Sequence, residues 1–351
     1  MASFISSYLP FGKSKDENMP APEKNRQWTT GQDGLDKLAF GEGEVPKPKE
    51  GEVLVKVLAV GLNYRDTEVI NGDYNHHASI QDTDALVPCS DMCGTVIQSS
   101  SPKLKVGARV MSIFNQTHLT GQVTEKDMAS GLEAACLPIA AVTAWMCING
   151  MRPLGQPADG SKKKETVLLQ GTGGVAIAGL QIAKAAGLNV IITSSSDDKL
   201  DRAKKDLGAD TGINYRTHWE WQEPVMKATQ NHGADIIFET GGARTLRKSF
   251  DSVAFGGLIN CVGYLSGKEE EQDTGGKVGV NVLALRRNVT LKGILNGPKD
   301  RFEEMVAFYE KHSIHPVVSK VFGFEEANKA LEFLSSGQHF GKVVVRVSKK
   351  E

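Results

Sequence analysis

The stretch VLLQGTGGVAIAG, residues 167–179, decides the fold, because it joins an apolar strand to an apolar helix through a glycine-rich turn. Its spacing matches G-x-G-x-x-G/A, in which Gly171 allows the tight turn and Gly173 lets a pyrophosphate approach the backbone. The predicted phosphate-binding residues are Gly171, Thr172, Gly173, Gly174, Val175 and Ala176. Such a turn can be purely structural, but the strand before it and the helix after it favour dinucleotide binding.

After residue 165, short apolar runs alternate with segments of helical periodicity. The runs are TVLLQ (166–170), NVIIT (189–193), TGINY (211–215), DIIFE (235–239), GLINCV (257–262) and VTLKGIL (289–295). The helical segment DKLDRAKKDLG (198–208) closes on Gly208, a typical C-terminal signal. This alternation predicts an α/β fold with a doubly wound parallel sheet.

The end of the second predicted strand indicates which dinucleotide binds. An NAD-selective site places an acidic side chain about 20 residues after the glycines, on the ribose hydroxyls. Here Ser194, Ser195 and Lys199 offer hydroxyl donors and a positive charge, which suit a ribose 2'-phosphate. The sequence therefore favours NADPH over NADH. Two alternatives stay open: Asp197 or Asp198 turns back to a plain ribose, or this segment only caps the helix at Ser196.

The first half of the chain has a different pattern. From GEVLVKVLAVGLN (51–63) to GARVMSIF (107–114), short alternating apolar runs are separated by Gly, Pro and Ser. This pattern predicts a small antiparallel β-domain. Residues 1–27 are polar and contain Pro20 and Pro22, which predicts an N-terminal extension.

Composition excludes several classes of protein. The 41 Lys and Arg residues nearly balance the 42 Asp and Glu residues, and no basic cluster suggests a nucleic-acid partner. Five irregularly spaced cysteines do not resemble a disulfide framework and indicate a reducing compartment. No apolar run reaches membrane-spanning length, so we expect a cytoplasmic protein with no membrane partner.

Several motifs together resemble the medium-chain dehydrogenase/reductase superfamily, in particular its zinc-free quinone oxidoreductase and alcohol dehydrogenase-like branch. They are GLNYRD (61–66), VPCSDMCGTV (87–96), LPIAAVTAW (137–145), the glycine turn, TSSSDDKL (193–200), INYR (213–216), GGLINCVG (256–263) and FGKVVVRV (340–347). The resemblance implies a GroES-like catalytic domain, residues 28–150 and 297–351, with a Rossmann cofactor domain, residues 151–296, inserted into it.

The resemblance also bears on metal binding. Zinc-dependent relatives place ligands where this chain has Asn63 and Ser90, and a third near LPIAA. A catalytic zinc normally needs three protein ligands, whereas Cys89 and Cys93 supply two. We expect no zinc and regard the cysteines as small buried apolar residues. Distant ligands, namely His76, His77 and His118, stay open as an alternative.

By the same resemblance, three residues would surround the reacting groups. Asn63 and Thr143 would lie beside the nicotinamide, and Tyr74 would line the pocket wall and donate to a substrate oxygen. Asn63 could instead hold its own loop, and Tyr74 could simply pack.

Five further residues carry over as cofactor contacts. They are Tyr215 beside the adenosine phosphate, Gly241 and Gly263 after the fourth and fifth strands, and Asn296 and Lys342 on the nicotinamide or phosphate side. Asn296 could equally be a turn residue, and Lys342 a solvated charge at the start of a strand.

The chain departs from this family between Phe114 and Ala134, where relatives insert further strands. The substrate cleft would lose a wall there, and the apolar residues of the arm, such as Phe4 and Tyr8, could replace it unless the arm is a disordered tail. The resemblance also implies a homodimer, formed through residues 277–295.

Three functions compete at this stage. The first is an NADPH-dependent, zinc-independent oxidoreductase acting on a carbonyl, quinone or activated alkene of a small molecule. The second is a non-redox biosynthetic enzyme, for a cyclisation or isomerisation, and the third is a cofactor-responsive binding protein without turnover. The fold alone does not separate them.

Overall fold

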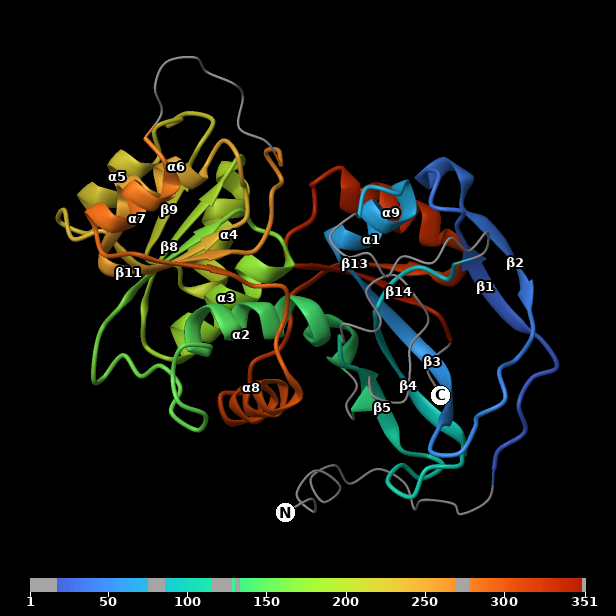
Figure 1. The fold of residues 1–351 in the computed structure, drawn as a ribbon. Coiled ribbons are helices and arrows are strands. Elements are labelled where there is room, and N and C mark those ends of the chain that lie inside the picture. The colour runs from blue at the N-terminus through green and yellow to red at the C-terminus, as the bar shows by residue number, and fades with distance from the viewer. Residues whose placement is uncertain (1–17, 75–85, 115–127, 130–132, 269–277, 349–351) are drawn as a thin grey trace. The chain divides into compact units, whose positions relative to one another are not determined.

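The computed structural model describes residues 18–74, 86–114, 128–129, 133–268 and 278–348 (Figure 1). Packing divides the chain into two compact units, residues 1–139 with 318–351 and residues 140–317. The bounds proposed from the sequence, at residues 150 and 297, follow a family resemblance and stay a prediction.

Residues 140–317 form the cofactor unit, which is built on a six-stranded sheet of order β12-β11-β10-β7-β8-β9. Every neighbouring pair in this sheet is parallel. The strands are β7 (Thr166–Gln170), β8 (Asn189–Ser194), β9 (Thr211–Asn214), β10 (Ala234–Glu239), β11 (Val253–Cys261) and β12 (Thr290–Gly293). The doubly wound parallel sheet predicted from the sequence is confirmed.

Helices cover both faces of this sheet (Figure 1). They are α2 (Val142–Asn149), α3 (Gly174–Ala185), α4 (Asp197–Leu207), α5 (Gln222–Ala228), α6 (Leu246–Ser252), α7 (Val280–Arg286) and α8 (Lys299–Lys311). Helices α2, α3 and α4 pack on one face, and α5 and α6 pack on the other. Helix α4 ends at Gly208, whose φ of 76° is the left-handed conformation expected of a glycine at that place.

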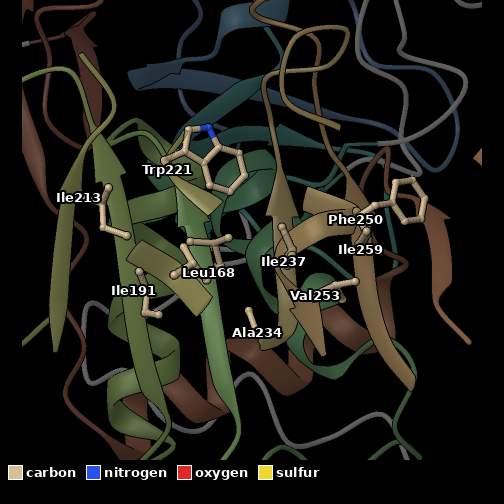
Figure 2. Packing of buried hydrophobic residues seen from close by; sticks show 10 residues of the cluster. Leu168, Ile191, Ile213, Trp221, Ala234, Ile237, Phe250, Val253 and Ile259 are labelled. Carbon is tan, nitrogen blue, oxygen red and sulfur yellow. The ribbon is translucent and has the colours of Figure 1, made fainter. Parts of the chain in front are cut away.

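An apolar cluster fills the α5 and α6 side of the sheet (Figure 2). Leu168, Ile191 and Ile237 contribute from three neighbouring strands, and Trp221 covers them from the start of α5. Burial of side chains on both faces explains why these strands read as continuous apolar runs rather than alternating ones.

Residues 18–139 and 318–348 contain the β-rich unit. Its larger sheet has the order β13-β14-β3-β4-β5-β6, antiparallel except for the β13 and β14 pair. The strands are β1 (Asn25–Thr29), β2 (Ala39–Gly43), β3 (Val53–Leu62), β4 (Asp91–Ser99), β5 (Arg109–Ser112), β6 (Met128–Ala129), β13 (Val318–Gly323) and β14 (Lys342–Arg346). The helices are α1 (Tyr64–Asn71) and α9 (Ala327–Ser335), with short helical turns at Leu35–Lys37, Glu133–Cys136, Leu137–Ala141 and Phe324–Glu326.

The N-terminal part of this unit includes a two-stranded sheet. Strand β1 starts at Asn25, so the last residues of the predicted extension pair with β2. Trp28 in β1 stacks on Phe40 and donates from its indole to the carbonyl of Phe324. The apolar residues of the arm lie outside the described residues, as does most of the segment between Phe114 and Ala134. Among the described residues, no helix is long and apolar enough to cross a membrane.

Candidate active site

The glycine turn lies between β7 and α3, at the carboxyl edge of the parallel sheet. Gly171 has a φ of 80°, and a Cβ built there would meet no atom within 4 Å. Helix α3 begins at Gly174, after Gly173, and no side chain caps that end. The first N–H groups of a helix have no partner within it, so this end offers free donors and the positive end of a dipole. The turn therefore has both the space and the donors to hold a pyrophosphate.

The predicted ribose-binding segment follows β8. Gly171 N donates to Thr193 Oγ1 at 3.3 Å, which ties the glycine turn to the end of this strand. Ser196 caps α4 by accepting from Lys199 N, so the capping role predicted as an alternative is confirmed for this residue. Asp197 accepts a hydrogen bond from Asn214 Nδ2 at 2.9 Å.

Lys199 and Tyr215 flank this segment. Burial, with the nearby charge of Arg202, holds the pKa of Lys199 below its ordinary value. Tyr215 directly follows β9, donates from its backbone N–H to the carbonyl of Ser194 at 3.0 Å and packs against the apolar cluster. The predicted residues Ser194 and Tyr215 are therefore neighbours, as are Gly171 and the end of β8.

Glu239, the last residue of β10, connects the loops at this sheet edge, and the sequence did not indicate this role. Its side chain is 1% exposed, and its oxygens accept from Gln170 Nε2 at 2.8 Å, from Gly241 N at 3.0 Å and from Gly242 N at 2.9 Å. The hydroxyls of Thr245 and Ser249 also donate to it. All five donors are uncharged, so hydrogen bonds alone compensate the buried carboxylate.

The same network joins three loops at the sheet edge. Gln170 directly precedes the glycine turn, and its Oε1 accepts from Gly241 N at 3.2 Å. Gly263 N donates to the carbonyl of Glu239 at 3.3 Å, so the loop after β11 is attached as well. The structure thus brings Gly241 and Gly263 together. An acidic residue closing the apolar run DIIFE, just before two glycines, was the available signal.

Two predicted residues lie elsewhere in the cofactor unit. Thr143 in α2 is 2% exposed, and within the described part of the chain its hydroxyl has no hydrogen-bond partner. A buried hydroxyl normally has one, so this atom is available to a ligand. Asn296 is half-buried between β12 and α8.

In the β-rich unit, a buried lysine joins the two ends of the chain. Lys342, at the start of β14, is 5% exposed, and its Nζ donates to Asn63 Oδ1 at 2.6 Å and to the carbonyl of Leu62 at 2.7 Å. The carboxylate of Asp91 lies 3.8 Å from the same nitrogen. The alternative of a solvated lysine is therefore wrong, because the ammonium of Lys342 is buried against the residues that join β3 to α1. Asn63 accepts one of these hydrogen bonds, and its Nδ2 donates to the carbonyl of Gly61 at 3.4 Å, so its side chain does make a contact within its own loop.

Two carboxyls in this cluster are buried. Asp91 accepts from Ser90 Oγ at 3.1 Å and from Ile139 N at 3.2 Å, and burial raises its pKa although Lys342 opposes the shift. Asp66 accepts from Asn63 N at 2.8 Å and from Arg65 at 3.0 Å. Burial outweighs the Arg65 charge and raises the pKa of Asp66 to about 6.

Tyr74 is packed beside this cluster. It is 5% exposed, and the guanidinium of Arg65 lies over its ring, 5.0 Å from the centroid. The same guanidinium lies 5.3 Å from the ring of Phe114. Tyr74 therefore has the packing contacts that were one of its two predicted roles, whereas its role as a donor stays a prediction.

Of the two cysteines of VPCSDMCGTV, Cys89 lies in a loop and Cys93 lies in a strand. Cys89 has a φ of 78°, burial raises its pKa, and Cys93 is buried within β4. The described residues contain no group of three or more metal-binding side chains. His76, His77 and His118, the distant alternatives, lie outside the described residues.

The pKa of Asp66 predicts how stability changes with pH. Its folded value of about 6 exceeds the ordinary 3.8, so its contribution is greatest below about pH 4 and is lost as pH rises through 6. Relative to Asp66→Asn, the wild type should lose about 3 kcal/mol of unfolding free energy across this range, at about 1.4 kcal/mol per pKa unit. Urea unfolding of both proteins at a series of pH values measures the difference. A constant difference would contradict the expectation.

Comparison with known proteins agrees with this architecture. The alcohol dehydrogenase GroES-like domain model matches residues 49–161, and the zinc-binding dehydrogenase model matches residues 174–311. A zinc-type alcohol dehydrogenase-like protein of Schizosaccharomyces pombe is 36% identical over 346 residues, covering 90% of this chain and 96% of its own.

Two further proteins cover a similar span. A Bacillus subtilis protein named as an NADP-dependent oxidoreductase is 28% identical over 330 residues, covering 87% of this chain and 91% of its own. The crystal structure of a protein assigned as an alcohol dehydrogenase from Sinorhizobium meliloti is 32% identical, with a TM-score of 0.79 over 93% of this chain and all of its own. With its parallel sheet, glycine turn and β-rich unit, the chain belongs to the medium-chain dehydrogenase/reductase superfamily.

Proposed function

We propose that this chain is an NADPH-dependent, zinc-independent oxidoreductase that reduces a carbonyl, quinone or activated alkene of a small molecule. The observation that carries the proposal is the uncapped start of α3 behind Gly171, at the carboxyl edge of a parallel sheet. Relatives named as an alcohol dehydrogenase-like protein and as an NADP-dependent oxidoreductase support the same class of reaction.

The cofactor unit fits a nicotinamide dinucleotide. The N–H groups at the start of α3 would bind the pyrophosphate, and Gly241 and Gly263 would let the cofactor cross the sheet edge. Thr143, whose buried hydroxyl has no partner among the described residues, would orient the nicotinamide end. When bound, the reduced nicotinamide supplies the hydride.

The β-rich unit would supply the groups that polarise the substrate. Lys342 holds the carbonyl oxygen of the Asn63 side chain, which fixes the orientation of that amide. Its NH₂ donates to the carboxylate of Asp91 and, at 3.4 Å, to the carbonyl of Gly61, and we propose that this fixed amide lies beside the nicotinamide. Tyr74 is the proposed donor to the substrate oxygen. Lys342 and Asn296 would also contact the cofactor.

Charge supports the proposal of zinc independence. The ammonium of Lys342 lies within 4 Å of both Asn63 and Asp91, beside Ser90. A divalent cation there would meet a buried positive charge, which is costly in a low-dielectric site. Two relatives are named as zinc-type proteins, but the residue types at these positions carry the argument for this chain.

We also propose a homodimer and a reducing, cytoplasmic setting. Strand β12 forms one edge of the parallel sheet, and Leu285, Leu291 and Leu295 around it are 80%, 38% and 42% exposed. An exposed strand edge with apolar side chains suits pairing with a second copy. All five cysteines are free, which agrees with a reducing compartment.

The proposed activity predicts that the protein consumes NADPH with one or more members of a panel of quinones, enones and aldehydes. The absorbance of the reduced cofactor measures the rate. Chelators should leave the rate unchanged, and metal analysis should find no stoichiometric zinc.

Gly173→Asp should abolish the reaction, because a carboxylate would repel the pyrophosphate. Gly41→Asp, in open space within β2, is the matched control. Product formed without cofactor consumption would point instead to the non-redox enzyme.

Cofactor choice gives a second expectation. Lys199→Ala should raise the Kd for NADPH about tenfold and leave that for NADH unchanged, since a charged hydrogen bond contributes about 1.5 kcal/mol. Lys205→Ala, on the same helix with a side chain 74% exposed, is the control. Titration by cofactor fluorescence measures both constants. Equal wild-type constants for the two cofactors would refute the preference.

The proposed dimer can be tested by light scattering at micromolar concentration. The wild type should give twice the chain mass, and Leu291→Asp should give a monomer because it places a charge on the exposed strand edge. Val321→Asp, at an exposed position of β13 in the β-rich unit, should remain a dimer. A monomeric wild type would contradict the proposal.

A further inference from the structure

Asn214 and Asp197 form a hydrogen-bonded pair between β9 and the start of α4. Asp197 Oδ1 accepts from Asn214 Nδ2 at 2.9 Å. The other side-chain atom of Asn214, Oδ1, accepts from Arg216 N at 3.0 Å. Because a backbone N–H can only donate, this second bond fixes which end of the amide faces Asp197.

The two residues differ in exposure. Asn214 is 9% exposed and ends β9, where its Cα is paired with Ser194 of β8. Asp197 is exposed and is the first residue of α4. A buried amide that makes two hydrogen bonds thus restrains an exposed carboxylate.

The position of this carboxylate matters for cofactor choice. Asp197 directly follows Ser194, Ser195 and Ser196, at the carboxyl end of β8. In dinucleotide-binding sheets, an acidic side chain in this region takes the ribose hydroxyls of NAD and repels a 2'-phosphate. The chain therefore carries, beside its proposed phosphate-binding residues, a group of the opposite preference.

We propose that Asn214 is a specificity-determining positioning residue, which holds Asp197 against β9 and so leaves the ribose side to Ser194, Ser195 and Lys199. This inference rests on the proposed function and adds to it a residue that touches no part of the cofactor. Without Asn214, the Asp197 side chain is free to take rotamers that face the ribose, and its charge then opposes a phosphate.

The test compares Kd values for NADPH and NADH in a set of full-length variants. Asn214→Ala should raise the Kd for NADPH about fivefold relative to that for NADH, the effect of about 1 kcal/mol between like charges about 4 Å apart in water. Asn214→Asp keeps the acceptor for Arg216 N but cannot donate to Asp197, and it should shift the ratio in the same direction. High salt should weaken both effects.

Removing the carboxylate separates repulsion from loss of structure. Asp197→Ala combined with Asn214→Ala should restore the wild-type ratio of Kd values, whereas Asp198→Ala combined with Asn214→Ala should not. Asp198 is the adjacent acidic residue, so this control makes the same change of charge. Circular dichroism of each variant reports the fold.

The ratio of the two Kd values decides the inference whatever the wild-type preference. An unchanged ratio in Asn214→Ala, or a shift that the Asp198 change reverses as well as the Asp197 change does, would overturn it. Equal wild-type constants would instead refute the proposed choice of NADPH, and a shift on Asn214→Ala would still support the role of Asn214.

Discussion

The buried carboxylate of Glu239 is the interaction on which the cofactor unit depends most. Removing a carboxylate from water costs several kcal/mol unless hydrogen bonds replace the lost hydration. Here the replacement comes from five uncharged donors, on β7, on the loop after β10 and on α6. Each donor must stay in place for the charge to be tolerated. The geometry of the loops at the sheet edge is therefore constrained by the need to solvate one side chain.

This constraint explains how glycine-rich loops, which are intrinsically flexible, can serve as a binding surface. Glycine-rich loops lose much conformational entropy on folding and have few side chains to hold them. In this chain the side chains that fix the loops belong to the residues just before the glycines. Gln170 precedes the first turn, and Glu239 precedes the second. The loops can thus lack side chains at their surface, as close approach of a pyrophosphate requires, and still be fixed from behind.

The sequence predicted those features that depend on neighbouring residues. The glycine turn, the six apolar runs and the end of α4 at Gly208 each follow from short-range pattern, and the structure has all of them. It did not predict the contacts of Glu239 with Gln170, 69 positions away, or of Lys342 with Asn63, 279 positions away. Lys342 could be taken for a solvated charge because nothing near it in the chain indicates burial. Long-range pairing of polar residues leaves little periodic signal, whereas burial of an apolar face does.

The cluster around Lys342 differs from Glu239 in what it can contribute. Its nearest carboxylate, that of Asp91, is 3.8 Å away, and the short contacts of the ammonium are to two neutral oxygens. A buried charge held this way gains less than a close, well-bonded ion pair, and replacing even such a pair by apolar residues is often neutral or stabilising. Stability is thus a weak reason for a lysine at this position. Its defined geometric effect is to fix the Asn63 amide, because the amide oxygen accepts from Lys342 while the amide nitrogen donates to Asp91 and to the carbonyl of Gly61.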